Sequence, residues 1–192
     1  MAEIKSAIEL ALEKAERYGR ASKEEMAVSQ YQEQGRQLAV NYLKGEGDLD
    51  AELKALAPKA QEAALAAAKE VLLRNLSLPR NGETDPRASR AVEGLLLVAR
   101  DKKAMARLKQ ELDQMLAQFL QVRHSAYQQL KSRFAATLGN MQRALEAQYR
   151  QKVRVEVEQL PQFQEEWRRF LGQLHDQFDP MLEDLKARMA NS

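Results

Sequence analysis

The stretch from Asp101 to Glu158 contains no proline and a single glycine, Gly139. Proline breaks a helix interior and glycine weakens it, so their near absence predicts one long helix or two helices stacked end to end. A helix of this length needs neighbours along its side, because most helical stability in proteins comes from packing of an apolar face. The rest of the chain has to be organised around this stretch.

The apolar residues of this stretch change their spacing part-way. The first group alternates between steps of three and four, the spacing of a left-handed coiled-coil seam, at Met105, Leu108, Leu112, Met115, Phe119 and Val122. From Ala126 to Leu160 the apolar residues advance mostly by four, so the apolar face rotates around the helix. This second part either winds the other way, turns to face different neighbours, or breaks near residues 138–140.

The segment after Pro161 is the natural partner of the seam. Large apolar residues recur there at helical spacing, at Phe163, Trp167, Phe170, Leu174 and Phe178. If the chain folds back near Pro161, this segment and the seam form an antiparallel pair. Asp179-Pro180 is expected to kink or restart the final helix.

Two helices are predicted at the N-terminus. The first runs from about Glu3 to Tyr18 and ends at Gly19, because glycine commonly follows the last turn of a helix. Ser22 and Glu25, three residues apart, have the form of a capping box and begin the second helix. Gly35 within that second helix suggests a close approach to another helix, or is simply tolerated.

Three further helix starts are marked before the long stretch. Asp48 or Asp50 caps a short helix, and Pro58 begins another that extends to about Leu76. Asp85-Pro86 reads as a cap followed by proline in the first helical turn, beginning a helix that ends near residue 99.

The composition agrees with an all-α fold. Ala, Leu, Glu, Gln, Lys and Arg dominate the 192 residues, with only 8 Gly and 5 Pro. The predicted fold is a helical bundle with a long antiparallel, coiled-coil-like helical pair. Residues 1–99 are expected to form the N-terminal bundle and 100–192 the long helix with the C-terminal helix, as two domains or one continuous domain.

Several classes of protein are excluded or disfavoured. Cysteine is absent, which removes disulfides, thiolate nucleophiles and cysteine-based metal sites. No stretch is long and apolar enough to span a membrane, and charges interrupt what would be the apolar part of a signal peptide. The chain is expected to be cytoplasmic, with no membrane span.

No catalytic or metal motif stands out. His175, Asp179 and Glu183 are spaced by four and could hold a metal, but Pro180 is expected to spoil the register, and a solvated polar face is favoured. Walker loops, dinucleotide fingerprints and nucleophile elbows are absent. The sequence therefore predicts neither an enzyme nor a bound cofactor or metal.

The strongest charge signal lies in the second part of the long stretch. Residues 100–160 carry 12 basic and 6 acidic side chains, and between Asp113 and Glu156 the only acidic residue is Glu146. The candidate residues for binding an anion or a partner are Arg123, Lys131, Arg143, Arg150 and Arg154. The favoured alternative is a solvated face, or ion pairs with acidic residues of positions 1–99.

The loop from Ser77 to Pro86 is the other candidate for function. It is longer than the usual connection between helices and contains the turn signal Asn81-Gly82. Such loops sometimes bind ligands. A plain connector is favoured.

The chain resembles a family of small bacterial helical proteins of unknown function. The resemblance rests on Glu3-Ile4-Lys5-Ser6-Ala7 through Ser22-Lys23-Glu24-Glu25, and on Asn75-Leu76-Ser77-Leu78-Pro79-Arg80, all in the first half. It implies a bacterial cytoplasmic helical protein and carries over no activity or site.

The function that the sequence favours is interaction or scaffolding through helix faces. A homo-oligomer or a protein partner is expected. The alternative is a nucleic-acid or polyanion binder that uses the basic face of the long helix.

Overall fold

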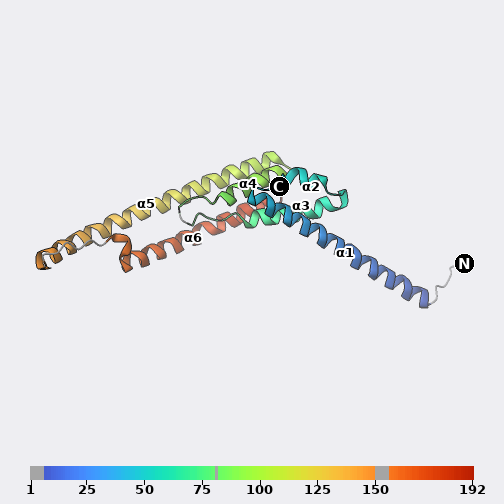
Figure 1. The fold of residues 1–192 in the computed structure, drawn as a ribbon, viewed down its shortest axis with the longest axis horizontal. Helices are drawn as coiled ribbons and strands as arrows, with labels where there is room; N and C mark the ends of the chain where they lie inside the picture. The colour runs from blue at the N-terminus through green and yellow to red at the C-terminus, as the bar shows by residue number, and fades with distance from the viewer. Residues whose placement is uncertain (1–6, 81, 150–155) are drawn as a thin grey trace. The chain divides into compact units, whose positions relative to one another are not determined.

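The computed structural model describes residues 7–80, 82–149 and 156–192, with 7–23 and 140–149 described by their backbone alone. These residues form six α-helices and one short 3-10 helix, with no strand among them, which confirms the all-α prediction (Figure 1). The elements are α1 (Ala7–Lys44), α2 (Leu49–Ala55), α3 (Pro58–Arg74), α4 (Pro86–Val98), α5 (Lys102–Tyr149), η1 (Val157–Gln159) and α6 (Pro161–Ala190).

The chain divides into two compact units. The first comprises residues 1–75 and 90–100, and the second comprises residues 76–89 and 101–192. The first unit therefore holds α1, α2, α3 and most of α4. The second holds the loop before α4, its first turn, α5, η1 and α6. That residues 1–99 and 100–192 fold as separate domains stays a prediction.

α1 is a single helix through both Gly19 and Ser22 (Figure 1). The predicted helix end at Gly19 and the predicted new start at Ser22 are therefore wrong. A glycine within a helix costs about 1 kcal/mol relative to alanine, which the good helix formers on both sides can offset. The predicted start at Glu3 lies outside the described residues.

α1 and α3 run parallel and in close contact. Gly35 lies directly against the backbone of Ala64, so a Cβ added to Gly35 would overlap the carbonyl oxygen of Ala64. Further along both helices, Tyr42 and Leu72 both lie against Gly94 of α4. Contacts that advance in the same direction along both helices define a parallel pair. The close approach suggested by Gly35 is confirmed.

Alanine fills much of the core of the first unit. Small side chains let helix backbones approach one another, and the buried residues of α1 to α4 include Ala39, Ala60, Ala64, Ala67, Ala68, Leu72, Ala91 and Leu95.

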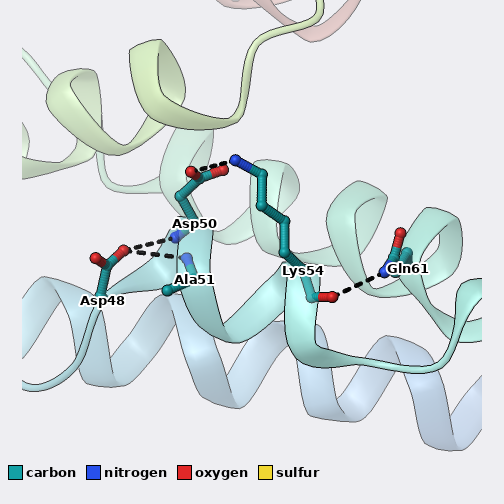
Figure 2. A network of polar contacts seen from close by, with 5 residues as sticks. All are labelled: Asp48, Asp50, Ala51, Lys54 and Gln61. Carbon is teal, nitrogen blue, oxygen red and sulfur yellow. Dashed lines mark hydrogen bonds and ion pairs between the residues drawn. The ribbon is translucent and has the colours of Figure 1, made fainter.

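Asp48 caps α2, as the sequence predicts. Its carboxylate accepts hydrogen bonds from the backbone amides of Asp50 and Ala51, each at 3.1 Å (Figure 2). The Nζ of Lys54 lies 2.6 Å from the carboxylate of Asp50. At the other end of α2, the side-chain amide of Gln61 donates to the carbonyl of Lys54 at 3.0 Å. Figure 2 shows how these contacts fix α2 at both ends.

Two aspartates mark the starts of the next helices. Asp85 accepts a hydrogen bond from the amide of Arg87 at 2.8 Å, and Pro86 is the first residue of α4, as predicted. Asp101 accepts hydrogen bonds from the amides of Lys103 and Ala104 at 3.0 and 2.9 Å. Asp101 thus satisfies amides that the first turn of α5 leaves without a helical partner.

α5 and α6 form the predicted antiparallel pair of the second unit (Figure 1). Phe119 contacts Phe178 edge to face, and closer to the start of α5 Glu111 pairs with Arg188 at 2.7 Å. The first five seam residues, from Met105 to Phe119, are buried. Val122 is 37% exposed, so its assignment to the seam is wrong. The line of contact has already begun to rotate around α5 there, and Tyr127 meets α6 instead.

The second part of α5 turns to face a different part of the chain. α5 continues through Gly139, which rules out a break there, and Leu138 packs in one cluster with Val157 of η1 and Phe163 of α6. The steps of four thus turn the apolar face of α5 towards η1 and the start of α6. α6 likewise runs unbroken through Pro180, so the predicted restart is wrong.

Candidate interaction surfaces

An aromatic cluster joins α5 to the first half of α6. Tyr127 makes edge contacts with Phe163 and Trp167, with ring centroids 5.8 and 5.1 Å apart. Phe134 meets Phe163 at 5.7 Å, and Trp167 stacks on Phe170 with centroids 5.6 Å apart. Such aromatic pairs add stabilisation beyond the area that they bury. The cluster holds the two helices together at the level where the seam ends.

A polar cluster borders the aromatic one. Glu158 forms an ion pair with Lys131 and accepts a hydrogen bond from the Tyr127 hydroxyl at 3.1 Å. Hydrogen bonding and attraction to Glu158 raise the pKa of Lys131, and the Lys131 ammonium lowers the pKa of Glu158. Burial, together with the hydrogen bond to Glu158, raises the pKa of Tyr127. Tyr127 therefore stays protonated and acts as a donor.

These pKa shifts predict the range of pH over which the pair of Lys131 and Glu158 stabilises the protein. The contribution of Glu158 to stability is complete above its ordinary pKa of about 4.3 and is lost as pH falls through its lowered pKa. The contribution of Lys131 is complete below its ordinary pKa of about 10.4 and is lost as pH rises through its raised pKa. Glu158→Gln is therefore expected to lower stability between these limits and to have little effect in strong acid.

Urea unfolding of the wild type, Glu158→Gln, Lys131→Met and the double variant, followed across pH, measures this window. At neutral pH the two single losses should add to more than the loss in the double variant. Losses that add fully at every pH would contradict the coupling between the two side chains.

Arg123 lies between α6 and the loop before α4. Its guanidinium carbon is 5.5 Å from the centre of the Trp167 ring, and a Cβ added to Gly82 would overlap its Nη1. Gly82 has a φ of +83°, a conformation that favours glycine. The Arg123 Nε is buried without a hydrogen-bond partner among the described residues. Arg123 thus packs against both the loop and Trp167.

The structure describes the side chains of only some of the predicted basic residues. Lys131 pairs with Glu158, and the neighbouring Arg133 pairs with Glu166 of α6. These acidic partners follow residue 155, so the expectation that acidic residues of positions 1–99 pair with them is wrong for both. Arg143 lies in α5 where the backbone alone is described, and Arg150 and Arg154 lie outside the described residues.

Sequence reasoning missed the acidic side of this cluster. Glu158 and Glu166 are 27 and 33 residues away from Lys131 and Arg133 along the chain. Their pairing depends on where the chain reverses. The apolar steps of four were the signal that this part of α5 faces new neighbours, but they do not name the neighbours.

Two grooves lie between α5 and α6. One has a volume of about 380 Å³, and its lining residues are Ala126, Gln129, Leu130, Arg133, Glu166, Trp167 and Phe170. The other, of about 440 Å³, is lined by Met115, Pro180, Met181, Leu185 and three charged residues. Met181 is 45% exposed at the second groove. Both grooves present apolar side chains beside an ion pair.

Of the three residues that the sequence offers as metal ligands, His175 and Asp179 are in contact, whereas Glu183 pairs elsewhere. The His175 Nδ1 lies 3.5 Å from the Asp179 carboxylate, while Glu183 pairs with Lys186 at 2.8 Å. Within the described part of the chain, no group of three or more His, Asp or Glu side chains is placed to hold a metal ion.

The N-terminal part of α1 extends beyond the start of α3. Pro58, the first residue of α3, precedes Ala64 by six residues, so in the parallel pair it lies opposite about residue 29 of α1. Val28 precedes that level and lies seven residues before Gly35, so it is on the same side of α1 as Gly35, yet it is 44% exposed. Its exposure shows that α3 does not cover this part of α1.

A model for a family of unknown function, DUF6657, matches residues 50–191, which is more than half of the chain. The chain belongs to this family. The DUF6657 match includes Asn75–Arg80, one of the two segments that carry the resemblance to a bacterial helical family. The other segment, between residues 3 and 25, lies before the match. The match also covers nearly all of the second half of the chain, where that resemblance has no residues. No curated protein and no solved structure matches the chain.

Among the described residues, no helix has both the length and the apolarity that crossing a membrane requires.

Proposed function

We propose that this protein is a non-enzymatic helical interaction protein that self-associates through the open face of α1. A bacterial source and a cytoplasmic location, both predicted from the sequence, are part of this proposal. The observation that carries it is the exposure of Val28, which lies on the same side of α1 as Gly35 but before the start of α3.

The lengths of the helices support this proposal. At 1.5 Å per residue, the 38 residues of α1 span about 57 Å, whereas the 17 residues of α3 span about 25 Å. Packing against other segments, more than intrinsic propensity, stabilises helices in proteins. A second copy would supply that packing for the open part of α1.

Changing Val28 tests the proposal. Val28→Glu is expected to weaken self-association, because a carboxylate in the interface would lose its water. Val122→Glu is the matched control, since Val122 is exposed to a similar degree on α5. Sedimentation velocity over a range of concentrations compares the variants. Equal self-association of Val28→Glu and Val122→Glu would count against the α1 face.

Nucleic-acid or polyanion binding through the basic face of α5 is the second proposal. The basic excess of residues 100–160 supports it, with 12 basic against 6 acidic side chains. Arg143→Glu, Arg150→Glu and Arg154→Glu together should then abolish binding to a heparin column or to duplex DNA, and wild-type binding should weaken steeply with salt. Unchanged binding in the triple variant would dismiss this proposal.

A further inference from the structure

The groove of about 380 Å³ between α5 and α6 has apolar lining from both helices. These apolar residues are Ala126 and Leu130 of α5, and Trp167 and Phe170 of α6. All four side chains are only partly buried, so apolar surface remains open to water. The volume is within the range of about 300–1,000 Å³ that is usual for small-molecule sites. The groove is therefore large enough for a small organic molecule.

The α6 side of this groove is a flat aromatic surface. The rings of Trp167 and Phe170 are stacked, with an angle of 14° between their planes and centroids 5.6 Å apart. Nearly parallel rings of this kind form an offset stack, which a further planar group can extend. The groove thus favours a ligand with a planar apolar body.

The polar lining residues of the groove are Gln129, Arg133 and Glu166. Arg133 pairs with Glu166, and the two side chains stay 63% and 44% exposed. The Arg133 guanidinium carbon also lies 5.4 Å from the centre of the Phe134 ring. A guanidinium has five N–H donors in one plane, and Arg133 contacts Glu166 through one terminal nitrogen, Nη2. Arg133 therefore retains donors for a second acceptor at the groove.

Positive charge is in excess at the groove. Arg123 lies against Trp167, with its guanidinium carbon 5.5 Å from the ring centre, and forms no ion pair with any residue in the described part of the chain. Of the charged residues that line the groove or contact Trp167 there, two are cations, Arg123 and Arg133, and one is an anion, Glu166. An anionic ligand complements this balance.

We propose that this groove binds a small organic carboxylate with a planar apolar body. The planar body lies against Trp167 and Phe170, and the carboxylate accepts hydrogen bonds from Arg133, because guanidinium and carboxylate are planar groups that match each other. The ligand competes with Glu166 for Arg133, and the positive charge of Arg123 offsets part of the repulsion from Glu166. The site is formed by α5 and α6 alone and does not depend on the proposed self-association.

Trp167 makes occupancy of the groove measurable, because it is the only tryptophan of the chain. The probe is para-phenylbenzoate, and the uncharged para-phenylbenzamide is its matched control. Titration of the whole 192-residue chain with the benzoate should change the fluorescence of Trp167 until the change saturates. The benzamide should bind about tenfold more weakly, since it lacks the charge-assisted hydrogen bonds to Arg133.

Two variants that break the same ion pair separate binding from a structural effect. Arg133→Met removes the donors and should weaken binding of the benzoate about tenfold. Glu166→Gln removes the competing acceptor and should strengthen binding about two- to threefold. A change of structure caused by loss of the pair would shift both variants in the same direction. Arg169→Met removes an exposed ion pair of α6 outside the groove lining and should leave the affinity unchanged.

Each outcome supports or overturns the site. Opposite shifts in the two variants, with weak binding of the benzamide, support it. Equal affinity for the benzoate and the benzamide, or variants that shift in the same direction or not at all, overturn it. Fluorescence of Trp167 that shows no saturable change up to millimolar benzoate also overturns it. Circular dichroism checks that helix content is equal in all the variants, and Arg133→Gln replaces Arg133→Met if the latter loses helix.

Discussion

Replacing Gly35 with alanine is expected to force α1 and α3 apart and to lower the free energy of unfolding by about 3 kcal/mol, the upper end for overpacking a core. The added Cβ would overlap the carbonyl oxygen of Ala64, which is backbone and cannot rotate away as a flexible side chain would. The gain in helix propensity, about 1 kcal/mol, only partly offsets this clash. Urea unfolding followed by circular dichroism measures the loss.

Gly172→Ala is the matched control for this change. Gly172 also lies within a helix, but a Cβ added there meets nothing within 4 Å. The same substitution is therefore expected to stabilise the protein by up to about 1 kcal/mol. If Gly35→Ala were equally stabilising, the close contact between α1 and α3 would be wrong.

Truncating Phe119 to alanine is expected to cost about 3–5 kcal/mol, the usual range for a buried phenylalanine. Phe119 is fully buried, and its ring contacts Phe178 and His175 of α6 with centroids 5.4 and 5.6 Å apart. The cavity would therefore open between the two helices of the antiparallel pair. Urea unfolding of the variant and the wild type gives the difference.

Phe170→Ala is the comparison for this loss. Phe170 is only partly buried, and its one described ring contact is the stack on Trp167. Its truncation should cost clearly less, because water fills the space at a surface. A loss at Phe119 no larger than that at Phe170 would contradict the placement of Phe119 in the centre of the pair.

Local signals in the sequence predicted most helix starts. Asp48, Pro58 and Asp85-Pro86 act through groups within a few residues of themselves, so their effect can be derived without knowing the fold. The same reasoning fails at Gly19 and Ser22, because a glycine followed by a capping sequence has the same local form at a helix end and inside a helix. The helix-forming residues before and after Gly19 and Ser22 decide whether the helix continues there.

The packing of α5 was predictable only where its pattern was regular. The alternation of three and four from Met105 to Phe119 predicts one partner along one line, and α6 is that partner. Beyond it, steps of four predict a rotating face but not what covers it. The contacts of Lys131 with Glu158 and of Leu138 with Val157 depend on where the chain turns back, which no local pattern specifies.

The association state of the wild-type chain tests the central claim most directly. Sedimentation equilibrium over a wide range of concentrations should show the mass of two chains or more, falling towards one chain only on dilution. A clean single-chain mass at the highest concentration would contradict self-association through α1.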